Sequence, residues 1–263
     1  QIWNMHVISL QHNAKSKLYD IARITLAYQF FEESRIDRSY QKTTQRTKLE
    51  QVDAISANLD LQKSINKTTL FYGLEGIHNG VTSLGTDLDI ETGIEENASS
   101  RYPDGATWQS FAAYLSSKTK LKENFTLQAG LRYNRVILNA DFDTTFFPFP
   151  FTSVNINSGA LTGSAGFAWL PAKDLQINFN LSTGFRAPNV DDIGKVFDSE
   201  PGNVTVPNPD LLPEYAYNID LGFIKGFGDI VEIQITGFYT LLSNAIVRRS
   251  FNLNGEDSII YAG

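Results

Sequence analysis

Cysteine is absent from the 263-residue chain, and histidine is rare. The missing thiols exclude a disulfide framework, a thiolate metal site and a cysteine nucleophile. His6, His12 and His78 lack the spacing of a metal-ligand set, and no Gly-x-Ser-x-Gly motif of a serine hydrolase is present. The sequence therefore predicts a protein that is not an enzyme, with no catalytic residues, no bound metal and no cofactor.

Positive charge is also in short supply. Lysine and arginine number 22 against 29 aspartates and glutamates, so the formal net charge is −7. A nucleic-acid-binding domain concentrates its basic residues on one face, whereas here they are scattered, with the densest group at 42–48. A solvated loop is the preferred interpretation of that group, and nucleic acid is not expected as a partner.

Long apolar runs are missing too. The longest candidates, at 146–151 and 165–170, are far shorter than the roughly 18–20 residues that a transmembrane helix needs. A transmembrane β-barrel is still allowed, because its strands are recognised by alternation rather than by continuous hydrophobicity.

What the chain does contain is alternation with a period of two. Apolar and polar residues take turns in the windows 125–134, 175–183, 217–223 and 231–236. Because successive side chains of a strand point to opposite sides, each window predicts a strand with one apolar and one polar face. Strands are predicted at 1–12, 18–33, 46–62, 68–90, 107–119, 124–140, 159–170, 174–185, 213–225 and 230–249.

A soluble β-sandwich would show the same alternation, but two features favour a membrane barrel. The segments are long, as expected when a tilted spanning strand needs about 9–11 residues and an average soluble strand only about 5–6. The connections also alternate in length, which is typical of barrels with short periplasmic turns and long extracellular loops. Short turns are predicted at 13–17, 63–67, 119–124, 171–174 and 225–229, and long polar connections at 34–46, 91–107, 141–158, 186–213 and 250–257.

We therefore predict an all-β fold, an antiparallel up-and-down transmembrane β-barrel. The start of the chain lacks the features of a signal peptide, and 259–263 reads as a strand cut short. We expect a partial barrel, with about ten strands of a larger one and an unpaired edge at each side.

The alternation also assigns faces within such a barrel. The apolar members of each strand should face lipid, and the polar members should face the lumen. The residues expected toward lipid are Leu127, Leu131, Ile177, Phe179, Ile233 and Ile235, and those expected toward the lumen are Gln128, Arg132, Gln176, Asn178, Glu232 and Gln234.

Two motifs flank the connection 186–213. The first reads Gly-Phe-Arg-Ala-Pro at 184–188, and the second reads Asn-Pro-Asp-Leu-Leu-Pro-Glu at 208–214. Together they resemble the paired boxes of TonB-dependent outer-membrane receptors, in which the first box ends a strand and the second opens the next. The motif residues are Phe185, Arg186, Ala187, Pro188, Asn208, Pro209, Leu211, Pro213 and Glu214.

The resemblance implies a barrel of the 22-stranded, plugged kind, and residues 1–263 would be part of it. The N-terminal plug domain, the TonB-contacting segment and the remaining strands would lie outside this chain. The resemblance also implies the outer membrane of a Gram-negative bacterium, with lipid and the TonB complex as partners. The implied activity is TonB-energised uptake of a scarce ligand.

An iron chelate such as a ferric siderophore is the favoured ligand, and haem, cobalamin and an oligosaccharide are alternatives. Haem-uptake members of the family carry an iron-binding histidine between the boxes, whereas 189–207 contains none. That departure disfavours haem. Two rival classes stay open: a passive porin-like channel, which would lack the paired boxes, and a soluble β-sandwich binding module.

The connection 186–213 is the candidate recognition element. It is about 28 residues long against a usual length of about 4–6, and long connections in compact folds tend to be functional or disordered. Its prolines and the box at each end argue against disorder. The candidate ligand-binding residues are Arg186, Asp191, Asp192, Lys195, Asp198 and Glu200. Bracing of the barrel rim, or contact with the plug, is the alternative role.

Arg186 itself has two interpretations. Its planar guanidinium suits an anionic ligand, but it could equally anchor the connection to a carboxylate such as Asp191, Asp198 or Glu200. The anchoring role is the favoured one.

Overall fold

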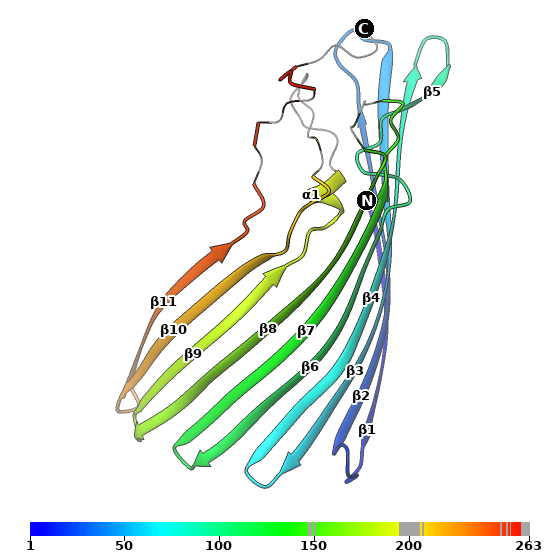
Figure 1. Cartoon of the computed structure of the whole chain (residues 1–263). Coiled ribbons are helices and arrows are strands. Elements are labelled where there is room, and N and C mark those ends of the chain that lie inside the picture. The colour runs from blue at the N-terminus through cyan, green and yellow to red at the C-terminus, as the bar shows by residue number, and fades with distance from the viewer. Residues whose placement is uncertain are drawn as a thin grey trace.

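The computed structural model describes residues 1–146, 149, 151–194, 206, 208–247, 249–250, 252 and 254–258. Within that part of the chain, no helix is long and apolar enough to cross a membrane. The fold is a single antiparallel sheet (Figure 1), in which each long strand pairs with its neighbours along the chain.

Ten long strands and one short strand make up this sheet, in the order β1-β2-β3-β4-β6-β7-β8-β9-β10-β11, with the short β5 paired to β4. Their bounds are β1 Ile2–Asn13, β2 Ile21–Asp37, β3 Thr44–Ile65, β4 Thr68–Asp89, β5 Glu95–Ala98, β6 Thr107–Lys122, β7 Phe125–Asp141, β8 Ser153–Ala172, β9 Leu175–Arg186, β10 Glu214–Phe227 and β11 Val231–Ser243. The all-β meander predicted from the alternation is confirmed.

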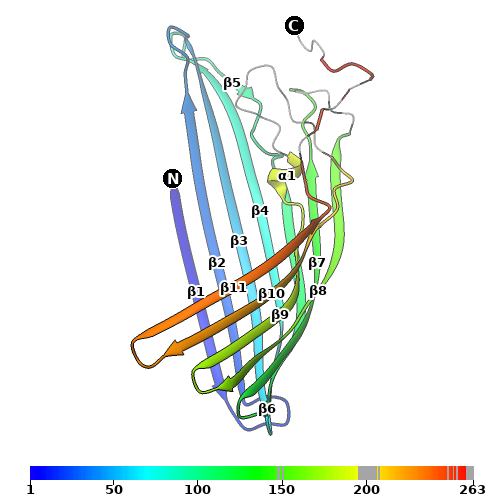
Figure 2. The same ribbon diagram turned by 90° about the vertical axis from the view of Figure 1, so that its left-hand side faces the viewer.

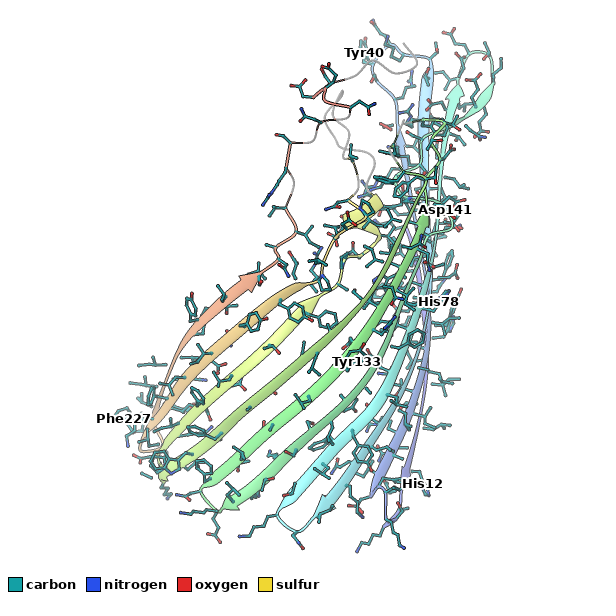
Figure 3. The ribbon with its side chains drawn as sticks, viewed as in Figure 1. His12, Tyr40, His78, Tyr133, Asp141 and Phe227 are labelled. Carbon is teal, nitrogen blue, oxygen red and sulfur yellow. The ribbon has the colours of Figure 1, made fainter. Side chains whose placement is uncertain are left out.

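The two edges of the sheet differ in the length of their connections. One edge carries the connections 14–20, 66–67, 123–124, 173–174 and 228–230, which have two to seven residues. The opposite edge carries 38–43, with six residues, and 90–106, 142–152 and 187–213, with 11 to 27 residues. His12 and Phe227 lie near the short-turn edge and Tyr40 lies at the far end (Figure 3). The predicted segregation is confirmed for the three longest connections. The prediction of a long connection at 34–46 is wrong, because β2 continues to Asp37 and β3 begins at Thr44.

The sheet is curved into part of a barrel wall. Figure 2 shows β9 to β11 crossing in front of β1 to β4, and Figure 1 shows β11 and β1 at opposite sides of the sheet. Among the described residues, β1 pairs only with β2 and β11 only with β10. The predicted partial, unclosed barrel is confirmed.

The two faces of the sheet follow the predicted alternation. Leu138 of β7 packs with Ile193 of the short helix α1 (Val190–Gly194), which lies on the concave side in both views (Figures 1 and 2). Arg132 is an even number of residues from Leu138 and shares its face, whereas Leu131 points to the convex side.

Directly opposed residues of paired strands share a face, so the strand registers extend this assignment to β9 and β11. All six apolar residues that were expected toward lipid lie on the convex face, and all six polar partners lie on the concave face. Contact of the convex face with lipid stays a prediction.

Near the long-connection edge, the alternation changes phase. On β7 the convex side carries Leu131 and Tyr133 and then the polar Arg135, while the concave side becomes apolar at Val136 and Leu138. Val154 and Ile156 on β8 lie opposite Ala140 and Leu138 in the ladder. These four residues belong to one buried hydrophobic cluster, which consists of Ala106, Leu138, Ala140, Phe142, Val154, Ile156 and Ile193. The packed core therefore lies inside the upper part of the wall, where α1 covers it.

Several elements differ from the sequence-based predictions, and four of the differences are informative. The short β5 falls within the expected loop 91–107, because 95–98 pairs with the overhanging end of β4. β8 begins at Ser153 rather than 159, because Val154 and Ile156 continue the ladder with the opposite phase. β11 ends at Ser243 rather than 249, and α1 lies inside the expected loop 186–213.

Gly73 provides a test of the wall's packing. Tyr114 crosses over it to donate a hydrogen bond to Asp60 (2.5 Å), and a Cβ at Gly73 would lie 2.2 Å from the Leu59 carbonyl oxygen and 2.8 Å from the tyrosine ring. We expect Gly73→Ala in the full-length protein to destabilise the sheet by about 1–3 kcal/mol, since overpacking forces the backbone and the ring to move.

The measurement is the temperature at which heating shifts the protein from the fast-migrating folded band to the slow-migrating unfolded band in a detergent gel. Gly80→Ala in the same strand is the matched control, because a Cβ there meets nothing within 4 Å. Equal melting temperatures for the two variants would contradict the packing described for Gly73.

Candidate functional site

The two sequence boxes meet at the upper end of neighbouring strands. β9 ends at Arg186 and β10 begins at Glu214, and these two residues are directly paired in the ladder. The 27 residues between them in the chain, 187–213, thus leave and re-enter the sheet at one point. A single side chain at that point can hold both ends of the connection.

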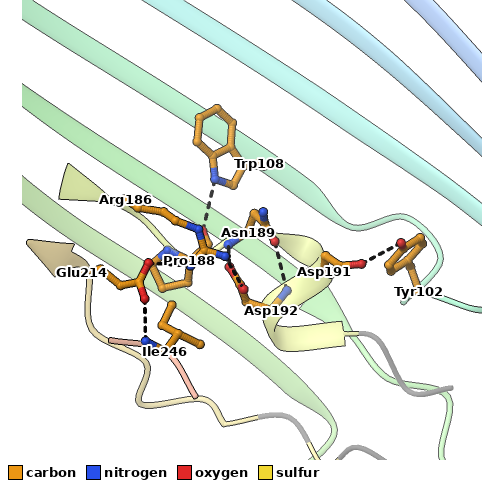
Figure 4. A network of polar contacts seen from close by, with 9 residues as sticks. All are labelled: Tyr102, Trp108, Arg186, Pro188, Asn189, Asp191, Asp192, Glu214 and Ile246. Carbon is orange, nitrogen blue, oxygen red and sulfur yellow. Dashed lines mark hydrogen bonds and ion pairs between the residues drawn. The ribbon is translucent and has the colours of Figure 1, made fainter. Parts of the chain in front are cut away.

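Arg186 occupies that point. Its Nη1 donates to Glu214 Oε2 at 3.0 Å, and its Nη2 donates to Asp192 Oδ1 at 2.5 Å. The planar guanidinium presents several donors in a fixed geometry, which suits two carboxylates at once. Arg186 therefore ties the start of β10 and the first turn of α1 to the end of β9 (Figure 4).

Glu214 is also the contact point for the segment that follows β11. Its Oε1 accepts a hydrogen bond from the backbone nitrogen of Ile246 at 2.6 Å. The Arg186 and Ile246 contacts use different carboxylate oxygens. One side chain thus links three segments at the long-connection edge.

The entry into α1 is closed by reciprocal capping. Asn189 Oδ1 accepts from the backbone nitrogen of Asp192, and Asp192 Oδ2 accepts from the backbone nitrogen of Asn189, both at 3.0 Å. This pattern satisfies two N–H groups that a helix start leaves unpaired. Pro188 before it is fully buried and limits the backbone angles of the chain leading into the helix.

α1 is held against the concave face of the wall by polar and apolar contacts. Trp108 Nε1 of β6 donates to the Pro188 carbonyl oxygen at 3.3 Å, and the Tyr102 hydroxyl donates to Asp191 Oδ1 at 2.8 Å. Ile193 has no exposed surface and belongs to the buried cluster with Leu138. The start of the connection is therefore folded into the mouth of the barrel.

The environment of Tyr102 alters its ionisation. Burial, and secondarily the hydrogen bond to Asp191, raise the pKa of the Tyr102 phenol from 10.0 to about 12. Both causes disfavour the phenolate, because it would be poorly solvated and would lie next to a carboxylate. Tyr102 thus acts as a neutral donor over the whole physiological pH range.

The structure describes only some of the six predicted ligand-binding residues, and it gives them different partners. Arg186 and Asp192 pair with each other, whereas Asp191 binds Tyr102 and is not the partner of Arg186 that was expected. Lys195, Asp198 and Glu200 lie outside the described residues. Ligand binding by any of the six stays a prediction.

The other motif residues are mainly structural. The ring of Phe185 lies 6.4 Å from that of Tyr215 on the next strand, and Leu211 packs against the buried cluster. Asn208 Oδ1 accepts from the Asp210 backbone nitrogen at 3.0 Å, which closes a turn across Pro209. Ala187 and Pro213 lie in the connection just outside the two strands.

Sequence reasoning missed Tyr102, Trp108 and Asn189. Tyr102 and Trp108 come from a different connection and strand, about 80 positions earlier in the chain. Asn189 could have been found, because Asn-x-x-Asp is a helix-capping pattern. Among the described residues, no group of three or more His, Cys, Asp or Glu could hold a metal ion, and Figure 3 places His12 and His78 far apart.

An open, curved antiparallel wall with short turns at one edge, and with the start of a connection folded against its concave side, defines a transmembrane-type β-barrel architecture. Comparison with known proteins identifies the kind of barrel. The family model for TonB dependent receptor-like β-barrels matches residues 3–259, and the chain belongs to this family.

The relatives have several different ligands. Haemoglobin-haptoglobin utilization protein B of Neisseria meningitidis serogroup A is 28% identical over 140 residues, which cover 51% of this chain and 17% of that protein. The copper transporter OprC superposes with a TM-score of 0.77 at 13% identity, over 91% of this chain and 38% of its own.

The ferric yersiniabactin uptake receptor FyuA of Yersinia pestis superposes with a TM-score of 0.61 at 16% identity, over 92% of this chain and 37% of its own. This chain thus spans well under half the length of the proteins it matches. The family consists of transport receptors of the Gram-negative outer membrane rather than enzymes, and the structural likenesses at this identity establish the fold alone.

The double ion pair of Arg186 generates a prediction. We expect Arg186→Gln in the full-length receptor to raise the rate of proteolysis within 187–213 about fivefold, the equivalent of about 1 kcal/mol for partly exposed ion pairs. Arg38→Gln is the matched control, because Arg38 is exposed at the same edge and donates to the Lys42 carbonyl oxygen instead. Equal cleavage rates in the two variants would contradict the anchoring role.

A second prediction concerns pH. Because the pKa of Tyr102 is raised from 10.0 to about 12, its contribution to docking α1 is fully present below pH 10 and is lost as pH rises through 12. The measurement is the alkaline absorbance titration of the wild-type receptor minus that of Tyr102→Phe, which isolates one phenol. The difference should titrate near 12, and a midpoint near 10 would show that the phenol is neither buried nor bonded to Asp191.

Proposed function

We propose that this chain forms part of the wall of a TonB-energised receptor that takes up an iron chelate, with a ferric siderophore as the favoured ligand. The observation that carries the proposal is the anchoring of the described ends of the connection, residues 187–194 and 208–213. Arg186 holds its two ends together, and α1 is seated on the concave face. Polar groups are thereby offered where a solute enters the barrel.

Family membership supports the partners in this proposal. The convex apolar face would contact outer-membrane lipid, and the TonB complex would act through a plug region outside residues 1–263. In this proposal the plug and the remaining strands lie in a larger receptor, and the length of the solved relatives, more than twice that of the part matched here, supports it.

Two observations bear on the choice of ligand. FyuA, a structural neighbour, is a ferric yersiniabactin receptor by its description, which supports a siderophore. The sequence relative of Neisseria meningitidis is a haemoglobin-haptoglobin utilization protein, and this observation favours haem as a second candidate. The absence of histidine from 189–207 argues against a histidine-ligated haem within this connection.

Replacement of the connection tests the proposal. The full-length receptor is produced in cells that lack other iron receptors, and 189–207 is exchanged for a short glycine-serine linker. We expect uptake of radioactive iron presented as catecholate or hydroxamate chelates to fall at least about tenfold, because one strong charge-assisted contact to a ligand is worth about that factor. Uptake should also require TonB.

Exchange of the connection 38–43 by the same linker is the control, and surface folding is checked by heat-modifiable migration. Growth on haemin, measured in parallel, reports on the second candidate. Unchanged uptake of every iron source by a correctly folded linker variant would leave the connection with a bracing role only.

A further inference from the structure

A cavity of about 440 Å³ lies under α1, on the concave face of β2, β3 and β4. Its floor is the sheet, and its roof is formed by the start of α1 and the connection before β6. Phe31, Val52, Val81, Trp108 and Val190 supply apolar wall, and Glu33, Glu50, Asn79, Arg101, Tyr102, Asn189 and Asp191 supply polar groups. Its volume lies at the low end of the range of about 300–1,000 Å³ that is typical of small-molecule sites.

The unusual member of this cavity is Glu50. Its side chain is only 5% exposed, and neither carboxylate oxygen has a hydrogen-bond partner within the described part of the chain. Asn79 Oδ1, on the neighbouring strand and in the same cavity, is also buried and unpaired. Buried polar groups are normally hydrogen-bonded, because leaving them unpaired is costly. The cavity therefore contains acceptors that lack donors.

Three positive charges, Arg101, Arg35 and Lys48, attract the Glu50 carboxylate electrostatically, but none of them donates a hydrogen bond to it. Glu33 lies directly opposite Glu50 in the ladder, and Arg35 donates to Glu33 at 2.7 Å. The guanidinium carbon of Arg101 lies 5.1 Å from the centre of the Tyr102 ring. Like charges directly opposite each other destabilise a strand pair, so Glu33 repels Glu50. The residues that line the cavity include three carboxylates, Glu33, Glu50 and Asp191, and one guanidinium, Arg101.

From these observations we infer that the cavity binds a protonated nitrogen group, an ammonium or a guanidinium, on a short apolar stem. Such a group donates several hydrogen bonds to a carboxylate. The aromatic residues Phe31 and Trp108, whose ring type attracts cations, line the same cavity. The stem would contact Val52 and Val81. The cavity suits an arm of a ligand rather than a whole iron chelate, so this inference rests on the proposed function and narrows its ligand to one with a cationic arm.

The group could come from the transported ligand or from a lysine or arginine elsewhere in the full-length receptor. We assign it to the ligand, because the roof of the cavity is the connection that is proposed to meet the ligand first. In that case the cavity is vacant in the unliganded receptor and must accept a small cation from solution.

The test uses the full-length receptor in detergent and two fluorinated probes, 4-fluorobenzylammonium and the neutral 4-fluorobenzyl alcohol. Fluorine line broadening gives the affinity of each, with empty micelles as the blank. We expect the ammonium probe to bind about tenfold more tightly than the alcohol, and Glu50→Gln to remove that preference. Val52→Phe, which fills the cavity without changing charge, should weaken both probes.

Glu95→Gln is the matched control, because Glu95 makes the same charge change on an exposed strand at the same edge. It should bind both probes as the wild type does. Failure of the wild-type receptor to bind the ammonium probe would overturn the inference, and a receptor lysine or arginine seated on Glu50 would give that result. An ammonium preference that survives in Glu50→Gln would overturn it as well.

Iron uptake has no part in this measurement, so the two proposals can fail separately. If iron chelates are neither bound nor imported while the ammonium probe binds through Glu50, the proposed ligand class is wrong and the cavity assignment stands. If chelates are imported but the Glu50→Gln substitution leaves the affinities of both probes unchanged, only the cavity assignment is wrong.

Discussion

The continuous antiparallel hydrogen-bond ladder from β1 to β11 is the constraint on which the rest of the structure depends. A chain that crosses a membrane must satisfy its backbone groups internally, and a sheet does so only by pairing every strand on both sides. In the middle of the wall every strand has a ladder partner on both sides, and these partners are its neighbours along the chain. The pairing of these strands therefore cannot change without breaking the ladder. Variation is confined to the edges and to the long connections, where the candidate site lies.

The face of the sheet that carries the apolar side chains changes along the length of the wall. In the lower part of the wall, the apolar residues point to the convex side, as lipid contact would require. Toward the long-connection edge, Val136, Leu138 and Ile156 point to the concave side instead. The inversion needs no irregularity in the ladder there, since β7 and β8 keep their register through it. It marks where the wall stops facing lipid and starts to support α1.

The ladder was predictable from the sequence because alternation and short turns are local signals. The phase change is also a local signal. Val154 and Ile156 were nevertheless assigned to a loop, because each strand was expected to keep its apolar residues on one face. The partners of Arg186 were harder to predict from the sequence. Asp191 and Asp192 are adjacent in the sequence, and only the capping geometry at Asn189 decides that Asp192 turns toward Arg186 while Asp191 turns toward Tyr102. Contacts between a connection and a distant strand leave no local signal.

The docked connection combines contacts of unequal strength. A partly exposed ion pair contributes about 0–1 kcal/mol, whereas burying a side chain such as Ile193 contributes about 1.5–3 kcal/mol. The burial of Ile193 therefore contributes more than the Arg186–Asp192 ion pair, while Arg186, Tyr102 and Trp108 determine the orientation of α1.

This division of roles also defines the cavity under α1. Asn189, Val190 and Asp191 line it only while the helix is docked, and the helix is docked because the concave face above Asn134 is apolar. Displacement of α1 would open the roof and expose Glu50 to water, which can solvate its unpaired oxygens. The carboxylate thus disfavours an empty, closed cavity, and a bound cation would remove that cost. Docking of the connection and occupancy of the cavity are therefore energetically linked.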